Sequence, residues 1–408
     1  MNILFFASKN LFRNTRRSLT TIAAIAAGYA AVILFGGYIS DVYNGLKAQA
    51  VSGERLGHLT IYKKGMLNEG RLKPRKYLLY PQDAKTLLAV VRDYPGVRLI
   101  SPRLPISGIL NHDSSSTIFI GEGVVPKDIP VLRGDLNQDY GGHLETDQPE
   151  GIAMSSEMAR LLGLGIDDEP ILITSTFAGQ ANAMDAHIVD IFQTGNAGTN
   201  DKTILVPFDY AQHLMDTNGV ERYVVLLDDI NRTEQARIDL TQRLQQAGLS
   251  VEIKTWKELS SFYNQVKNLF DMIFTFIFSI VFVVIIMSVI NTMGMTVIER
   301  TREIGTLRAL GLRRRGVVGL FASEGALLAI IGVAIGLATS LLVSWAVDIA
   351  QITYTPPNSS NAVPLLVDIN GMQILVISLL ATVLAAVSSA WPALGAARKE
   401  IHTALIHV

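Results

Sequence analysis

The residue types that usually carry catalysis are sparse in this chain of 408 residues. The seven histidines never approach the His-Glu-x-x-His spacing that places two zinc ligands on one helical face. Cysteine is absent, which excludes cysteine nucleophiles and thiolate metal sites. No Gly-x-Ser-x-Gly elbow is present, and the run Asp113–Ser116 is typical of a hairpin turn. The sequence predicts no catalytic residue, no metal site and no cofactor held by this chain itself.

Two further function classes are excluded by the sequence. A phosphate-cradling loop would read Gly-x-x-x-x-Gly-Lys-Ser/Thr, and no segment of the chain matches it. Any ATP-driven work would therefore need an energy source outside this chain. The balance of 35 Lys+Arg against 36 Asp+Glu gives no basic surface, so nucleic acid is not an expected partner.

One segment, 299–315, combines dense charge with an apolar face. Eight of its 17 residues are charged, yet Ile304, Leu307 and Leu310 recur at a spacing of three, as on one side of a helix. Gly311 is a natural residue to stop such a helix. A helix end that only marked the cytoplasmic side would need basic residues alone, without interleaved glutamates and apolar residues. The pattern favours a helix that docks on a partner protein.

Four nearly charge-free stretches must position this segment. Together they hold 111 residues and a single charged side chain, that of Glu324. Each exceeds the roughly 20 apolar residues that cross a bilayer core of about 30 Å, and buried soluble helices seldom run this long without a polar face. The first stretch is also longer than the apolar part of a cleaved signal peptide. The predicted membrane helices are residues 18–40, 272–298, 316–347 and 369–397.

Basic residues mark one side of these spans. The segments 1–17, 299–315 and 398–408 carry a combined net charge of +9, whereas the connection 348–368 has two aspartates and no base. The positive-inside rule places the three basic segments in the cytoplasm. Residues 41–271 and the short loop 348–368 then lie outside. The expected location is the cytoplasmic (inner) membrane, with both termini cytoplasmic and the large domain periplasmic.

The outer segment, 41–271, reads as an α+β domain with a net charge of −7. Helices are expected at 81–94, 155–162 and 232–247, and a glycine-containing loop near 130–150 is a possible junction between two lobes. Alternating or short apolar runs predict the strands at 56–62, 97–101, 104–110, 116–121, 152–154, 170–174, 187–193, 203–206, 221–227 and 250–254.

Several segments resemble one known family. These are the motif Glu299-Arg-Thr-Arg-Glu-Ile-Gly-Thr-Leu-Arg-Ala-Leu-Gly311 with Val317, Phe321, Glu324, Leu328, Gly332 and Gly336, the opening Ala7–Thr20, and the ending Pro392–Ile401 with Ala404-Leu405. They resemble the FtsX-like permease domain of the MacB/LolCDE superfamily of ABC transporters. The resemblance implies an α-helical membrane protein with four transmembrane helices, one plus three. It also implies a large extracytoplasmic α+β (MacB-like periplasmic core) domain inserted between helices 1 and 2.

The resemblance also implies partners. The chain would form a homo- or heterodimer with a second permease copy or a related permease, in contact with membrane lipids, and would work with two copies of a separate ABC ATPase that binds ATP and Mg. Stalks at about 41–52 and 256–271 would carry motion to the outer domains. The cytoplasmic coupling helix would dock on the ATPase through Glu299, Arg300, Arg302, Glu303, Ile304, Gly305, Leu307, Arg308, Leu310 and Gly311.

Three residues within the third span are expected to position membrane helices. Glu324 lies about 12 Å along the helix from Gly316, near the boundary marked by Arg313–Arg315, and the family carries a glutamate there. Gly332-x-x-x-Gly336 is a spacing that allows close helix approach.

The substrate class stays open between alternatives. The outer segments Asn44–Leu46 with Leu56–Ile61, and Val189–Gly195 with Asp201 and Tyr210–Leu214, look most like LolC/LolE-type lipoprotein-releasing permeases. Lipoproteins or another envelope substrate are therefore expected, with a periplasmic carrier or membrane-fusion protein as a possible partner. The alternatives are tripartite efflux of peptides or drugs, and FtsX-like signalling to a cell-wall hydrolase.

Overall fold

The computed structural model divides the chain into two compact units. Unit 1 comprises Met1–Tyr43, Val266–Thr353 and Pro364–Val408, and unit 2 comprises Asn44–Gln265 and Tyr354–Val363. The residues that the structure describes are 15–70, 72–113, 115–133, 144, 148–194, 196, 198–355 and 362–398.

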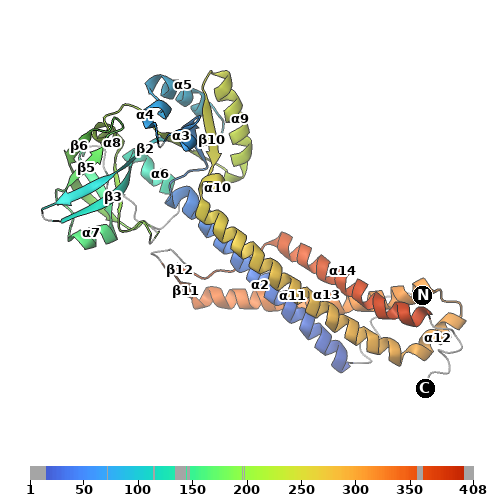
Figure 1. The fold of residues 1–408 in the computed structure, drawn as a ribbon. Coiled ribbons are helices and arrows are strands. Elements are labelled where there is room, and N and C mark those ends of the chain that lie inside the picture. Colours follow the sequence, from blue (N-terminus) through green and yellow to red (C-terminus); the bar gives the residue numbers. More distant parts are fainter. Residues whose placement is uncertain are drawn as a thin grey trace. The chain divides into compact units, whose positions relative to one another are not determined.

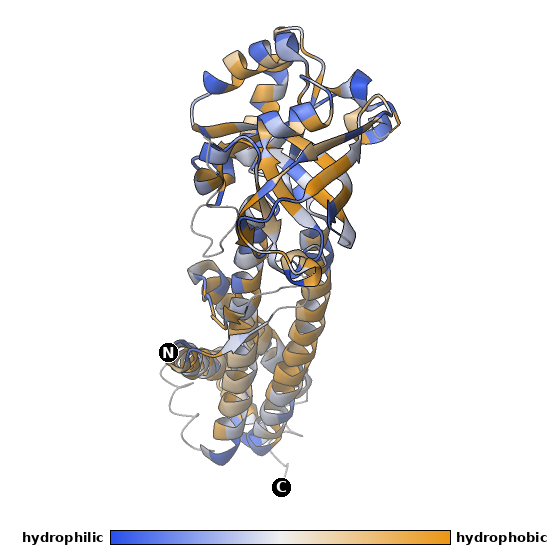
Figure 2. Cartoon of the chain, turned by 90° about the vertical axis from the view of Figure 1, so that its left-hand side faces the viewer, coloured by the Kyte–Doolittle hydropathy of each residue, from blue (hydrophilic) through white to orange (hydrophobic). Residues whose placement is uncertain are grey.

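Four long helices form unit 1 or lead out of it (Figure 1); the first three contain the predicted spans, and the fourth begins at Gly371, two residues after the start of the span predicted at 369–397. They are α2 (Thr15–Ala48), which continues as the π-helix η2 (Gln49–Gly53), α11 (Ser261–Glu299), α13 (Arg314–Ala350) and α14 (Gly371–Arg398). Within the described residues these four are long and apolar enough to cross a membrane, and Figure 2 shows them in mostly hydrophobic colours. A helix of 39 residues is about 58 Å long, so α11 and the joined α2–η2 exceed a bilayer core of about 30 Å.

Small residues let the helices of unit 1 pack closely. A Cβ added to Gly336 would lie 2.7 Å from the carbonyl oxygen of Ala26 on α2, and one on Gly332 would lie 2.7 Å from the Ile25 side chain. Gly28 allows the same close approach of α2 to Val281 on α11. The glycine pair predicted from its spacing therefore forms the contact between α13 and α2.

Unit 2 is built around a mixed sheet of ten strands in two halves. In the order β10-β1-β9-β2-β3-β8-β4-β7, neighbouring strands are hydrogen-bonded, and the hairpin β5–β6 attaches to β2. The strands are β1 (Leu59–Lys63), β2 (Val97–His112), β3 (Ser115–Val124), β4 (Gly151–Ser155), β5 (Ile171–Ser175), β6 (Ala181–Asp185), β7 (His187–Phe192), β8 (Thr203–Pro207), β9 (Arg222–Leu227) and β10 (Val251–Thr255).

Strand β2 joins the two halves because it changes partner along its length. Its first part, to Arg103, pairs with β9, and its second part, from Leu104, pairs with β3. The helices α5 (Pro81–Arg92) and α9 (Thr233–Gln246) cover the β9 half, whereas α7 (Ser156–Leu162) and α8 (Phe208–Leu214) pack on the β3 half. Two apolar cores follow from this division.

The shorter elements connect these parts. They are α3 (Met66–Glu69), α4 (Pro74–Tyr77), η3 (Pro126–Asp128), α6 (Ile129–Arg133), η4 (Ile230–Arg232), α10 (Trp256–Leu259), α12 (Thr301–Ala309), β11 (Thr353–Tyr354) and β12 (Val363–Pro364). Four long apolar helices, one before and three after an inserted α+β domain, are the predicted fold class.

Local differences from the sequence expectations have physical causes. The two strands expected at 97–101 and 104–110 are one strand, since Pro102 and Pro105 lie within β2 without breaking it. Strand β6, whose residues are mostly small and polar, was not predicted. The second expected stalk is interrupted at Ser260, between α10 and α11. Most of the loop expected at 130–150 lies outside the described residues.

Candidate functional site at the helix between the second and third spans

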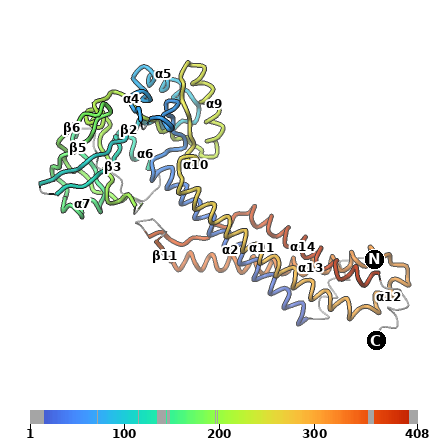
Figure 3. Tube along the Cα trace, in the orientation of Figure 1, coloured from blue at the N-terminus to red at the C-terminus, as the bar shows by residue number. Residues whose placement is uncertain are grey.

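The charged segment after α11 folds into the short helix α12, which leads into α13 (Figure 3). Arg300 is the single residue between α11 and α12. At the other end, Gly311 has a φ of +97°, its amide donates to the Arg308 carbonyl, and the Leu312 amide donates to the Leu307 carbonyl. This is the Schellman arrangement that ends a helix at a left-handed glycine. Gly311 therefore turns the chain back, as its sequence position predicts.

Arg300 ties this turn to its neighbours. Its Nη1 donates to Glu324 Oε1 of α13 over 2.9 Å, and its Nε donates to Glu303 Oε2 of α12 over 2.9 Å. The guanidinium also lies over the ring of Phe321 at 5.5 Å. Burial opposes the charged form, but the two carboxylates outweigh it, so the pKa of Arg300 is raised. The arginine stays charged and joins α12 to α13.

Glu324 is buried, with 3% of its surface exposed. The sequence identified it as the only charge within a span but gave no partner for it. The bond to Arg300 satisfies a carboxylate that would otherwise be costly in an apolar helix bundle. The contact joins α13 to the residue that precedes α12, and the positioning role of Glu324 stays a prediction.

The predicted docking residues of α12 have different environments. Ile304 and Gly305 are buried, as is Thr301, which was not predicted, and Ile304 packs into the apolar core of unit 1. Leu310 is 81% exposed. The half-buried residues are Arg300, Glu303, Leu307 and Arg308, and the exposed ones are Arg302, Leu310 and Gly311, together with Thr306, which was not predicted. The apolar triplet is therefore not one outward face, because Ile304 anchors the helix while Leu310 points away from it.

Two contacts join α2 and α11 in the same part of unit 1. Arg17 Nη1 lies 2.6 Å from Glu299 Oε1, in an ion pair that is partly exposed. At least one helical turn from this ion pair, the hydroxyls of Thr21 on α2 and Thr292 on α11 are 2.6 Å apart. Glu299, predicted as a docking residue, therefore also contacts the first long helix.

No metal-binding group of histidine and carboxylate side chains is found among the described residues.

The sequence did not identify one other polar feature, a buried cluster in unit 2 around Glu122. A signal for it exists: Glu122 is the only charged residue in the sequence of β3, and Arg103 directly precedes the apolar run Leu104–Ile106 of β2. A charge at an inward position of a strand needs a buried partner.

Two family models match the chain. The MacB-like periplasmic core domain matches residues 18–243, and the FtsX-like permease C-terminal domain matches residues 275–401. The second match contains α12, Arg300 and Glu324.

Individual proteins are similar over much of the chain. The lipoprotein-releasing system transmembrane protein LolC of Xylella fastidiosa (strain 9a5c) is 25% identical over 79% of this chain and 81% of its own length. The pyoverdine export ATP-binding/permease protein PvdT of Pseudomonas syringae pv. syringae (strain B728a) is also 25% identical, over 81% of this chain and 51% of its own length. The solved periplasmic region of MacB from Actinobacillus actinomycetemcomitans is 14% identical with a TM-score of 0.37, over 50% of this chain and 92% of that region.

Proposed function

Because the chain belongs to the family of ABC transporter permeases with an FtsX-like permease domain and a MacB-like periplasmic core domain, we propose that it transmits the motion of a separate ATPase to unit 2. Two ATPase copies, which bind ATP and Mg, act on a dimer of this chain or of this chain with a related permease. Helix α12 is the coupling helix and faces the cytoplasm, and unit 2 lies on the periplasmic side of the inner membrane.

The observation that carries this proposal is the contact of Arg300 with α13. A force on α12 reaches α11 through the chain itself, and it reaches α13 through the Arg300–Glu324 bond. Since α11 is 39 residues long and continuous, it can carry a displacement beyond the bilayer core without an intervening loop. A surface-exposed ion pair would be a poor link, but this one is largely buried.

The docking face in this proposal is the exposed side of α12. Arg302, Thr306 and Leu310 follow one another at intervals of four residues, so they lie on one side of the helix. The buried Ile304 and Gly305 hold the opposite side against unit 1. Leu310, with its large exposed apolar surface, is the residue that gains most from burial in a groove.

A matched pair of leucine substitutions tests the docking face. Full-length chain is purified in mild detergent, and the ABC ATPase that accompanies it is identified by mass spectrometry and then titrated back. Leu310→Asp should weaken its binding at least tenfold. Leu72→Asp places the same change at an equally exposed leucine of unit 2 and should leave binding unchanged. Equal affinities for both variants, or the absence of an ABC ATPase from the purified complex, contradict the proposal.

Lipoproteins are the proposed substrate class, and the similarity to LolC over most of both chains supports it. Depletion of the protein followed by fractionation of the envelope should retain lipoproteins in the inner membrane. Unchanged sorting argues against this substrate. Loss of an exported small molecule would then favour efflux, in keeping with the similarity to PvdT. A defect confined to cell-wall hydrolysis would favour signalling.

A further inference from the structure

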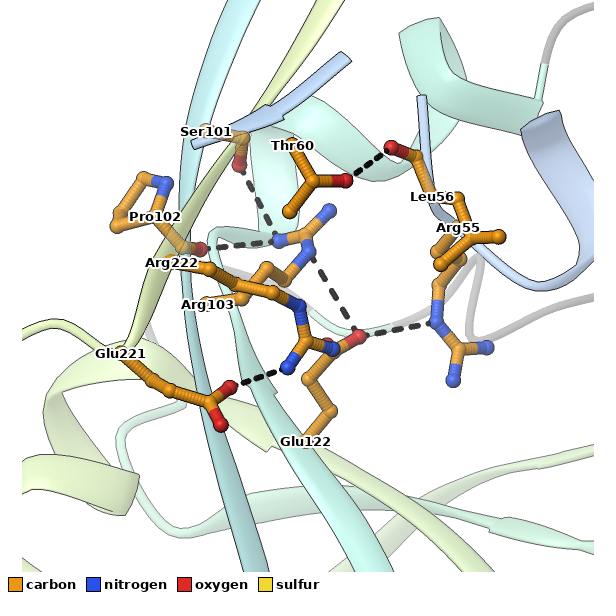
Figure 4. Close-up of polar contacts among 9 residues, drawn as sticks. All are labelled: Arg55, Leu56, Thr60, Ser101, Pro102, Arg103, Glu122, Glu221 and Arg222. Carbon is orange, nitrogen blue, oxygen red and sulfur yellow. Dashed lines mark hydrogen bonds and ion pairs between the residues drawn. The ribbon is translucent and has the colours of Figure 1, made fainter. Parts of the chain in front are cut away.

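A buried cluster in unit 2 gathers three arginines around one carboxylate (Figure 4). Glu122 on β3 has a side chain that is 8% exposed. Its Oε2 lies 3.2 Å from Arg55 Nε and 3.7 Å from Arg103 Nε, and its Oε1 accepts a hydrogen bond from Arg222 Nη2. One carboxylate is therefore the common partner of three guanidinium groups.

Two of these arginines belong to the sheet itself. Arg103 on β2 and Arg222 on β9 are directly opposite each other in the strand register. Like charges in such a pair repel unless a counter-charge lies between them. Burial lowers the pKa of Arg103 to about 10, against the opposing field of Glu122. Burial by itself would raise the pKa of Glu122. The positive charges of Arg222, Arg103 and Arg55 outweigh this effect and lower the pKa, so the carboxylate remains ionised.

Glu122 lies where the two halves of the sheet meet. Its partner across the strands is Pro105, just after β2 leaves β9 and begins to pair with β3. The ion pairs from Glu122 to Arg103 and Arg222 thus connect β3 with the β9 half of the sheet. The backbone connects the halves through β2, and this cluster connects them through side chains.

The third arginine comes from the end of the helix α2–η2, which we call the stalk end (Gln49–Arg55). The amides of Glu54 and Gly57 donate to the carbonyls of Gln49 and Val51, so the turn stays bonded to the helix. Arg55 and Gly57 both have positive φ, 57° and 61°. A Cβ on Gly57 would lie 2.5 Å from the Val224 side chain of β9, so the turn is pressed onto the sheet. The helix end therefore fixes where Arg55 points.

The cluster is an inefficient way to stabilise a fold. Buried ion networks often contribute little net stability, because desolvation offsets the attraction between the charges. Without Arg55, Glu122 would still have Arg222 hydrogen-bonded to it and Arg103 nearby. Arg55 is therefore not needed to neutralise the charges of the sheet. It is needed for a side-chain connection between the helix end and β3.

We propose that the Arg55–Glu122 ion pair is the link through which the stalk end moves the β3 half of the sheet. Arg55 is a positioning residue: it acts on the β3 half of the sheet through Glu122. The purpose of this link rests on the proposed function, in which α2 carries motion to unit 2. The link itself can be measured without an ATPase, so its failure is distinguishable from failure of the proposed function.

Distance distributions between spin labels test the link in the full-length chain in lipid nanodiscs. The chain has no cysteine, so labels can be placed freely. One pair, Gly45→Cys with Ser116→Cys, spans the helix and the β3 half. The reference pair, Gln82→Cys on α5 with Ser116→Cys on β3, does not include the helix α2–η2. All three sites are exposed. Arg55→Gln should broaden the first distribution at least twofold and leave the reference distribution unchanged, and Arg55→Lys should restore the narrow one.

A matched control removes a different ion pair of unit 2. Lys63→Gln breaks the contact of Lys63 with Asp83, which are 3.0 Å apart and join β1 to α5. This change should leave both distributions as in the parent. No broadening with Arg55→Gln overturns the link. Equal broadening of both pairs, or a chain that fails to fold, also overturns it, because Arg55 would then only support the sheet.

Discussion

Arg300 Nη1 and Glu324 Oε1 lie 2.9 Å apart, and this pair fastens the short helix α12 to the third long helix. The carboxylate is almost fully buried, and the arginine is 16% exposed in its side chain. The pair comes from residues 24 positions apart, so it closes the turn between α11 and α13. The coupling proposal depends on this closure.

Breaking this pair from one side should destabilise unit 1. Glu324→Leu leaves the Arg300 charge with Glu303 only, and removing one partner of a buried pair costs up to about 3–5 kcal/mol. Adding Arg300→Met should recover at least half of the loss. Urea unfolding of the Trp256→Phe chain, followed by the fluorescence of Trp345 and Trp391, measures both. A double variant as unstable as the sum of the single variants contradicts this expectation.

The same assay should show that an exposed pair matters less. Glu299→Gln removes the ion pair with Arg17. The side chains of Glu299 and Arg17 are 36% and 46% exposed, respectively. Solvent screens such pairs, which contribute about 0–1 kcal/mol. The unfolding midpoint should therefore change little.

Gly336→Ala should destabilise the contact between α13 and α2. The new Cβ would lie 2.7 Å from the backbone oxygen of Ala26, and backbone cannot move aside as a flexible side chain can. Overpacking of this kind costs about 1–3 kcal/mol. Gly319→Ala, in the same helix but with open space around it, should be neutral or slightly stabilising. Equal effects of the two substitutions on the thermal midpoint would show that close packing at Gly336 is unimportant.

His58 should make unit 2 less stable in acid. Burial lowers its pKa from 6.5 to about 4, and its Nδ1 accepts a hydrogen bond from the Leu227 amide. Between these two values the unfolded chain binds a proton that the folded chain does not, so stability falls as the pH decreases from about 6.5 to about 4. Fluorescence of the buried Trp256, with Trp345 and Trp391 replaced by Phe, reports unfolding of this unit.

The control for this titration keeps the acceptor and removes the proton site. In His58→Asn, the side-chain oxygen can replace Nδ1 as acceptor for Leu227. The difference in unfolding free energy between parent and variant should depend on pH only within that window. A difference that is constant from pH 7 to pH 4 means that His58 does not titrate as stated.

The proposed orientation predicts opposite labelling of two exposed sites. Thr306→Cys on α12 and Ser116→Cys on β3 can each be the only cysteine of the chain. A membrane-impermeant maleimide added to spheroplasts should label Ser116→Cys at once, and Thr306→Cys only after permeabilisation. The reverse result would invert the topology, and labelling of both sites in intact spheroplasts would contradict a membrane between them.

Much of the fold followed from local sequence patterns. Charge-free stretches longer than a bilayer core predicted the four long helices, and alternation of apolar residues predicted most strands, because both patterns are local. The end of α12 at Gly311 was predictable for the same reason, since a left-handed residue at a helix end favours glycine. Strand β6 was missed because it carries no apolar alternation.

The sequence by itself determined the membrane class, the one-plus-three order of the spans and the short charged helix between the second and third spans. Only the tertiary structure decided which charges are partners. Arg300 and Glu324, like Arg55 and Glu122, lie far apart in the chain, and no local periodicity relates them. Glu324 and Glu122 are buried, and an ionised group in an apolar interior is tolerated only where the fold brings an opposite charge to it.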